Sequence, residues 1–147
     1  MVDSPSEVHP PVSAGATELD FGGLHFDVSF RGPAGATLRV SGPVNGERKE
    51  LLRFDDFVES PHYHVPADGS ATMFDRTTLG DPLDWFVSQI SDHLGELLTA
   101  AGFSEVLPDV DLGAVRANAG SIRKAMEDCV PEGFVRVPGF GLRRDVA

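Results

Sequence analysis

The first half of the chain alternates apolar and polar residues with the period of half-buried strands. Every second residue from Leu24 to Phe30 is apolar, which predicts a strand with one face in a core. The same period returns at Leu38 and Val40, and again between about Lys49 and Phe57. Three strands are therefore expected in the first sixty residues.

Short turn signals separate these strands. Residues 32–35 read Gly-Pro-Ala-Gly and reverse the chain after the first strand. Asn45 and Gly46 both tolerate a positive φ, as a two-residue hairpin turn requires. Tyr63 and Val65 then indicate a fourth strand. Consecutive strands joined by such turns predict an antiparallel meander of at least four strands.

The second half changes to the period of an α-helix. Asp81 suits the N-cap, a proline follows it, and Gly102 is the expected stop. Apolar residues recur every three or four positions between them, which predicts one long amphipathic helix. A second, C-terminal helix is predicted from Asp111 to about Cys129, with a short edge strand at 135–137. Strands followed by helices predict an α+β fold with the long helix covering the sheet.

The same pattern predicts the core and the domain boundaries. The chain of 147 residues is the length of one domain, and residues 1–16 are rich in Ser and Pro without periodicity. We therefore expect a disordered N-terminal lead-in at 1–16 and a single domain at 17–147. The expected core residues are Phe26, Val28, Phe30, Leu38, Val40, Leu52 and Phe54 from the strands, and Phe86, Ile90, Leu94 and Leu97 from the long helix.

Composition narrows the class of protein. The net charge of −11 disfavours binding of nucleic acid or of an anionic membrane, because both need a basic surface. No segment approaches the roughly 18 apolar residues of a membrane span. No apolar signal region follows Met1, and the single Cys129 excludes an internal disulfide, so the expected location is the cytoplasm. The strong preference for Arg over Lys suggests a bacterial source.

Charge is distributed unevenly along the chain. Residues 112–147 carry a net charge of +2 and the preceding residues −13. The basic C-terminal part can therefore lie against an acidic surface of the same chain or of a second subunit. The second arrangement makes a homodimer or a protein partner the expected assembly.

The strongest candidate site surrounds two histidines. His62 and His64 lie two residues apart on a predicted strand and so project to the same face. Imidazole nitrogens with nearby carboxylates are ligands that zinc, iron or manganese accept, which predicts a site for a divalent transition metal. Asp55 shares strand parity with Arg53, and a charge-assisted bond between them would leave the imidazoles free for a metal or an anionic ligand.

Two further interpretations remain open. In the first, His62 and His64 are polar surface while Tyr63 and Val65 pack inward. In the second, the two histidines act as general acid and base on a small or phosphodiester substrate. The sequence thus predicts a non-catalytic accessory or partner-binding domain, with a small enzyme as the alternative.

A short motif also carries a family resemblance. Residues 53–55 read Arg-Phe-Asp, and after five residues 61–64 read Pro-His-Tyr-His, before an acidic turn and a helix. This arrangement resembles a family of small uncharacterised bacterial proteins, classed only as a domain of unknown function. More remotely it is similar to TumE-like small toxins, and the resemblance spans residues 51–98. The toxin analogy implies that the site residues are Arg53, Asp55, His62 and His64.

Overall fold

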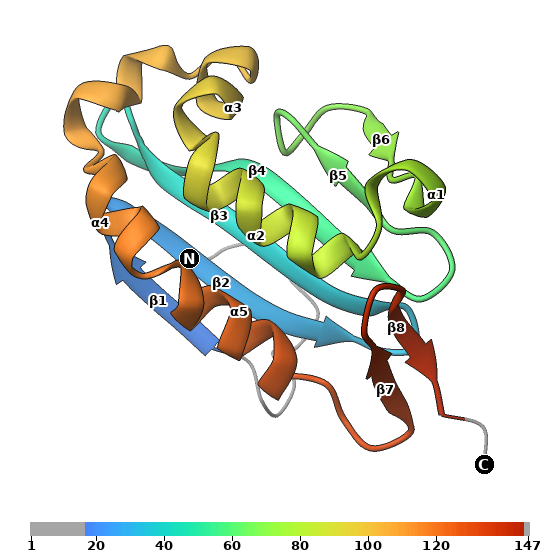
Figure 1. The fold of residues 1–147 in the computed structure, drawn as a ribbon. Helices are drawn as coiled ribbons and strands as arrows, with labels where there is room; N and C mark the ends of the chain where they lie inside the picture. Colours follow the sequence, from blue (N-terminus) through green and yellow to red (C-terminus); the bar gives the residue numbers. More distant parts are fainter. Residues whose placement is uncertain (1–16, 146–147) are drawn as a thin grey trace, which may run out of the picture.

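An antiparallel meander of six strands forms the frame of the molecule (Figure 1). The computed structural model describes residues 17–145, so the lead-in predicted at 1–16 lies outside the described residues. The strands pair in the order in which they occur in the sequence, which confirms the predicted meander and the α+β class. They are β1 (Thr17–Phe21), β2 (Leu24–Arg31), β3 (Gly35–Val44), β4 (Glu47–Phe57), β5 (His62–His64) and β6 (Ala71–Met73).

The hairpin between β3 and β4 shows how local sequence and register combine. Asn45 and Gly46 adopt φ values of 54° and 79°, as the predicted two-residue turn requires. Further along, the register shifts between Val40 and Ser41, so that β4 carries one extra residue. Ser41 pairs with Glu50, whereas Val40 pairs with Leu52. This bulge turns Glu50 to the same face of the sheet as Arg53, which follows it on β4.

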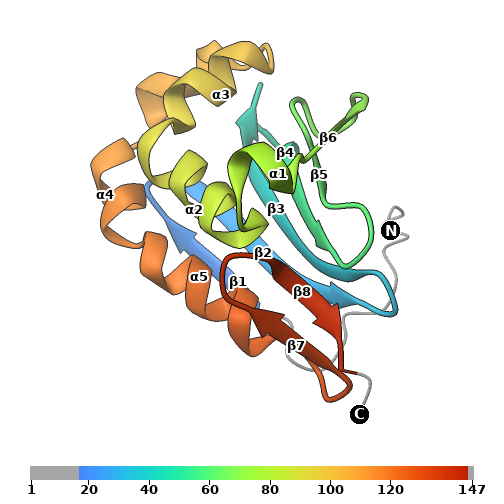
Figure 2. The ribbon, with the colours of Figure 1, turned by 45° about the vertical axis from the view of Figure 1, so that its right-hand side comes forward.

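Helices cover one face of the sheet (Figures 1 and 2). All of the predicted core residues are buried between the two layers except Leu97, which is partly buried against them. Ile122 and Met126 complete this core from the C-terminal part of the helical layer. The helices are α1 (Arg76–Leu79), α2 (Pro82–Asp92), α3 (Leu94–Ala100), the 3₁₀ helix η1 (Ser104–Asp109), α4 (Leu112–Ala117) and α5 (Ala119–Asp128).

Both predicted helices are divided, which corrects the sequence-based boundaries. The Asp81 carboxylate caps α2 as predicted, but the backbone at His93 leaves helical geometry (φ −132°, ψ 16°) and separates α2 from α3. The ring of His93 bonds to Glu96 at 3.0 Å there. Asn118 divides α4 from α5, and its side chain bonds to the carbonyl of Ala114, in competition with the helical ladder. Apolar spacing continues across both breaks, so the hydrophobic pattern does not mark them.

The C-terminal strand is also placed differently from the prediction. Instead of extending the main sheet at 135–137, β7 (Phe134–Val137) pairs with β8 (Gly141–Arg144) in a separate two-stranded sheet. Leu142 of this hairpin is fully buried in the common core. Within the described part of the chain, no helix is both long enough and apolar enough to cross a membrane.

Candidate metal centre

Strand register places Asp55 beside the two histidines. In the antiparallel pair of β4 and β5, Asp55 lies opposite His62, and Arg53 lies opposite His64. Tyr63 points to the other side, where its ring packs 5.1 Å from that of Trp85, centroid to centroid. The two imidazoles therefore lie on the sheet face turned away from the helices, as strand parity predicted.

The potential ligand atoms are close together. The Oδ2 atom of Asp55 lies 2.9 Å from Nε2 of His62 and 3.6 Å from Nε2 of His64. One ligand atom from each of the three residues fits within 4.8 Å of the others. Bonds of about 2.1 Å to a shared metal place neighbouring ligand atoms about 3.0–3.4 Å apart, depending on the coordination angle. The two carboxylate–imidazole distances lie close to this range.

Backbone carbonyls fix the orientation of both imidazoles. Nδ1 of His62 lies 2.7 Å from the carbonyl oxygen of Ser60, and Nδ1 of His64 lies 2.9 Å from that of Gly69. Because a carbonyl oxygen only accepts, each Nδ1 carries the hydrogen and each Nε2 faces the carboxylate. At the 2.9 Å contact of His62, either a proton or a metal ion must lie between Nε2 and the carboxylate, since two lone pairs would otherwise oppose each other. Metal-binding histidines commonly use their second nitrogen in this way.

Thr37 holds the carboxylate from the other side. Asp55 is only 3% exposed, and a buried carboxylate needs hydrogen bonds to replace its water. The hydroxyl of Thr37, on β3, donates to Oδ1 of Asp55 at 2.8 Å, which leaves Oδ2 facing the imidazoles. Sequence reasoning missed Thr37 because its only signal is the pairing of β3 with β4, which sets it opposite Asp55.

The predicted bond between Arg53 and Asp55 is wrong. Nε and Nη2 of Arg53 donate to the two carboxylate oxygens of Glu50 at 2.9 and 3.0 Å. This hydrogen-bonded pair raises the pKa of the guanidinium, with desolvation opposing it. The bulge in β4 makes the contact possible, because residues three apart on a regular strand face opposite sides. Asp55 is thereby left to the imidazoles.

Two other acidic residues that lie near the histidines in the sequence, Asp56 and Glu59, are engaged elsewhere. Asp56 is fully buried on the helix side of the sheet and pairs with Arg136. Glu59 pairs with Arg144 at 2.9 Å. Among residues 17–145, Asp55 with the two histidines is the only group of three potential ligands that comes together.

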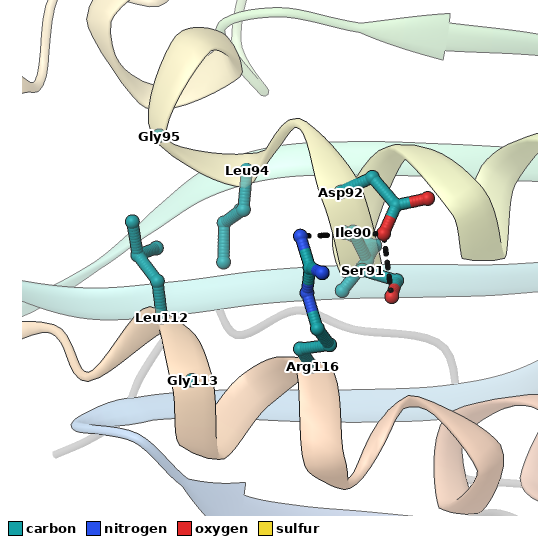
Figure 3. A pocket seen from close by; sticks show the side chains of 8 residues that line it. All are labelled: Ile90, Ser91, Asp92, Leu94, Gly95, Leu112, Gly113 and Arg116. Atoms are coloured by element: carbon teal, nitrogen blue, oxygen red, sulfur yellow. Dashed lines mark hydrogen bonds and ion pairs between the residues drawn. The ribbon is translucent and has the colours of Figure 1, made fainter.

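Two further features of the helical layer offer no comparable chemistry. Cys129 is buried, and desolvation raises the pKa of its thiol to about 11. A pocket of about 300 Å³ opens between α2, α3 and α4 (Figure 3). Its lining includes the apolar side chains of Leu94 and Leu112, and its charged groups Arg116 and Asp92 pair with each other at 3.5 Å. This pocket therefore presents apolar surface and one neutralised ion pair.

The fold and the site define an antiparallel α+β domain with a cluster of three potential metal-ligand side chains on the outer face of its sheet. Residues 14–126 match the family described as Domain of unknown function (DUF7700), and the chain belongs to this family. No curated protein matches the chain, and no solved structure matches it. The expected membership in a family of unknown function is confirmed, while the bacterial source and the similarity to TumE-like toxins stay predictions.

Proposed function

We propose that this protein binds one divalent transition metal ion through Asp55, His62 and His64. The observation that supports this proposal is the shared aim of the two Nε2 atoms at one carboxylate oxygen, with each Nδ1 held by a backbone carbonyl. Without a metal, only Nε2 of His62 lies within hydrogen-bond distance of the carboxylate, because Nε2 of His64 lies 3.6 Å away. A single divalent cation satisfies all three side chains at once.

The three potential ligands indicate which metals can bind and what kind of metal site they form. Two imidazole nitrogens and one carboxylate oxygen suit zinc, iron or manganese. Three protein ligands leave one position open in tetrahedral geometry and three in octahedral geometry. Open positions are typical of metal sites that bind a substrate or activate water, whereas structural zinc sites are closed by four protein ligands. The site thus supports the small-enzyme alternative through a metal.

Metal-free acid–base catalysis has less support. Nδ1 of each imidazole is engaged with a backbone carbonyl, and Nε2 of His62 lies 2.9 Å from the carboxylate. His62 therefore offers no nitrogen to a substrate proton, which a general base must do, whereas Nε2 of His64 lies 3.6 Å from the carboxylate, beyond hydrogen-bond distance. The non-catalytic interpretation, in which protonated imidazoles only pair with Asp55, remains the alternative, and a metal titration separates it from the proposal.

The test is calorimetric titration of chelator-treated protein with Zn²⁺, Mn²⁺ and, without oxygen, Fe²⁺. We expect at least one of these metals to bind at one ion per chain, with proton release visible as a dependence of the enthalpy on the buffer. The variant with both His62→Ala and His64→Ala should lose at least about 100-fold in affinity, because two of three ligands are removed.

The matched control is His25→Ala. His25 is also a strand histidine on the outer face of the sheet, and its ring contacts Asp20 at 2.7 Å and Glu18 at 3.2 Å. Its replacement should leave metal affinity unchanged. Absence of binding for all three metals, or equal affinity in the double variant and the wild type, would contradict the proposal. Circular dichroism establishes that each variant is folded.

A further inference from the structure

Arg53 stands next to the proposed metal ligands on the same face of the sheet. It lies directly opposite His64 in the pairing of β4 with β5. Opposite residues of an antiparallel pair have Cβ atoms about 4.5–5.5 Å apart, within reach of long side chains. Asp55 is also near enough for its charge to act on the guanidinium. A ligand bound to the metal on this side would therefore have Arg53 as a neighbour.

The guanidinium of Arg53 is held in place by two hydrogen bonds and has further N–H groups that can donate to a ligand. Its Nε and Nη2 atoms bind Glu50 in a two-point contact, and the side chain is 26% exposed. Nη1 makes no hydrogen bond with any residue in the described range 17–145. A guanidinium held along one edge has already lost much of its side-chain freedom, so a ligand that binds its remaining donors pays little further entropy.

The two sides of the site differ in character. Along β4, Arg53 precedes Asp55 by two residues, and Phe57 follows it by two. The ring of Phe57 packs edge-on against His62, with centroids 5.2 Å apart. One flank of the cluster is thus aromatic and the other carries a cation with unused donors.

The balance of charge specifies the class of ligand. A divalent cation, the Asp55 carboxylate and two neutral imidazoles sum to one positive charge. Beside them, the guanidiniums of Arg53 and Arg39 are balanced by the carboxylates of Glu50 and Asp27. The occupied site is then cationic and lies beside guanidinium donors, which match the oxygens of a carboxylate or phosphate.

We propose that the open positions of the metal bind a small oxyanion, either a carboxylate or a phosphate group, and that Arg53 binds the same anion. This proposal rests on the metal site proposed above. One oxygen of the anion binds the metal and another accepts hydrogen bonds from the guanidinium. Arg53 is therefore the residue that selects an anionic ligand over a neutral one.

The experiment uses the full chain loaded with Co²⁺, whose visible absorption changes when an anion enters its coordination sphere. Acetate and inorganic phosphate are titrated separately, so that the two arms distinguish a carboxylate ligand from a phosphate ligand. We expect at least one of them to change the spectrum of the wild type. Arg53→Gln should weaken that anion by about 10- to 100-fold, the usual worth of hydrogen bonds to a charged group. Arg53→Lys keeps the positive charge but loses the paired N–H donors of the guanidinium. Its affinity for the anion should therefore lie between those of the wild type and Arg53→Gln.

Arg48→Gln is the matched control, because it removes the same charge from an exposed position on the same strand. It should titrate like the wild type. The Co²⁺ affinity of each variant is measured first: if the wild type does not bind Co²⁺, the metal site itself is wrong. If Co²⁺ binds but neither anion changes the spectrum, or Arg53→Gln titrates like the wild type, the metal proposal stands and the role of Arg53 is overturned.

Discussion

Thr37 determines how Asp55 presents its oxygens to the two histidines. Its hydroxyl occupies Oδ1 at 2.8 Å, so that Oδ2 alone faces both Nε2 atoms. Thr37 is fully buried, and no water can replace its hydroxyl without a rearrangement of β3 and β4. A neutral side chain thus controls the geometry of a charged cluster without being one of the candidate ligands.

We expect Thr37→Val to weaken metal binding by about 10- to 100-fold, because partners that orient a metal ligand commonly contribute that much. The same variant should lower the free energy of unfolding by about 1–3 kcal/mol, since it leaves a buried carboxylate oxygen without its donor. Metal titration and urea denaturation measure the two effects. Thr78→Val removes a similar hydroxyl–carboxylate bond, to Asp75 on the surface, and should leave metal affinity unchanged. Unchanged affinity in Thr37→Val would limit Thr37 to a structural role.

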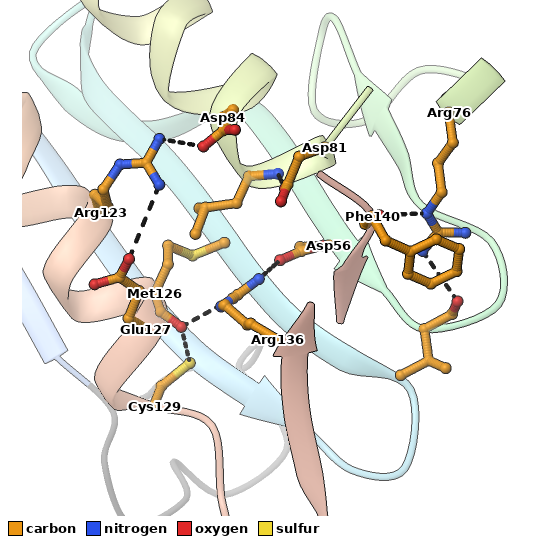
Figure 4. Close-up of polar contacts among 12 residues, drawn as sticks. Asp56, Arg76, Asp81, Asp84, Arg123, Met126, Glu127, Cys129, Arg136 and Phe140 are labelled. Carbon is orange, nitrogen blue, oxygen red and sulfur yellow. Dashed lines mark hydrogen bonds and ion pairs between the residues drawn. The ribbon is translucent and has the colours of Figure 1, made fainter. Parts of the chain in front are cut away.

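At the scale of elements, one buried ion pair docks the C-terminal hairpin on the sheet. Arg136 of β7 binds the Asp56 carboxylate of β4 and donates to the carbonyl of Met126 at 3.0 Å (Figure 4). Arg76 makes a second link, donating to the carbonyl of Phe140 at 2.8 Å. The hairpin lies beyond the residues that match the family, so residues outside the matched domain neutralise a buried charge within it.

The Asp56–Arg136 pair makes stability depend on pH. Burial raises the pKa of the Asp56 carboxyl above its ordinary value of 3.8, and Arg136 opposes this shift. A raised carboxyl pKa in the folded state means that stability is fully present below the ordinary pKa and is lost as pH rises through the folded pKa. Removing Arg136 should raise the folded pKa further and so increase the loss at neutral pH.

We expect Arg136→Met to lower the free energy of unfolding by about 3–5 kcal/mol near pH 7, the usual cost of leaving a buried charge alone. The loss should be smaller near pH 4.5, where more of Asp56 is protonated in the fold. Urea denaturation at the two pH values measures this difference. Arg144→Met is the control, because it breaks the exposed pair with Glu59 and should cost about 0–1 kcal/mol. Equal losses in both variants, or no dependence on pH, would contradict the role given to Arg136.

At the scale of the whole molecule, most basic side chains of the C-terminal part are paired with acidic side chains of the same chain. Four basic side chains of the C-terminal part contact acidic residues that precede residue 112. These pairs are Arg116 with Asp92, Arg123 with Asp84, Arg136 with Asp56, and Arg144 with Glu59. Of the two arrangements expected from the sequence, the contact within the same chain is present, and the homodimer stays a prediction.

We therefore expect the molar mass in solution to be independent of salt. A dimer held by complementary charges would dissociate between about 50 mM and 1 M salt, because exposed charges are screened over a few ångströms at the higher concentration. Since these arginines already have partners, light scattering at micromolar concentration should give the same mass at both. A mass that falls from twice 15.7 kDa to 15.7 kDa as salt is added would show a charge-driven dimer instead.

Local sequence alone was enough to predict strands β2 to β5 and the faces that they present, although β1, β6 and β8 were not predicted. Alternation placed Phe26 and Val28 in the core, and the two-residue spacing placed His62 and His64 together on the opposite face. The N-cap at Asp81 could be predicted in the same way, because the backbone N–H of Leu83, only two residues on, donates to its carboxylate. These features depend on backbone geometry over a few residues, so a pattern in the sequence suffices to predict them.

Only the tertiary structure decided which side chains meet at the site. The bulge in β4 brought Glu50 to Arg53, and the pairing of β3 with β4 brought Thr37 to Asp55. As a result Asp55 faces the imidazoles instead of the guanidinium. Register, bulges and helix breaks are set by the packing of one element against another, because a shift of one residue exchanges the two faces of a strand. No local pattern records that choice, since the groups that enforce it lie far away in the sequence.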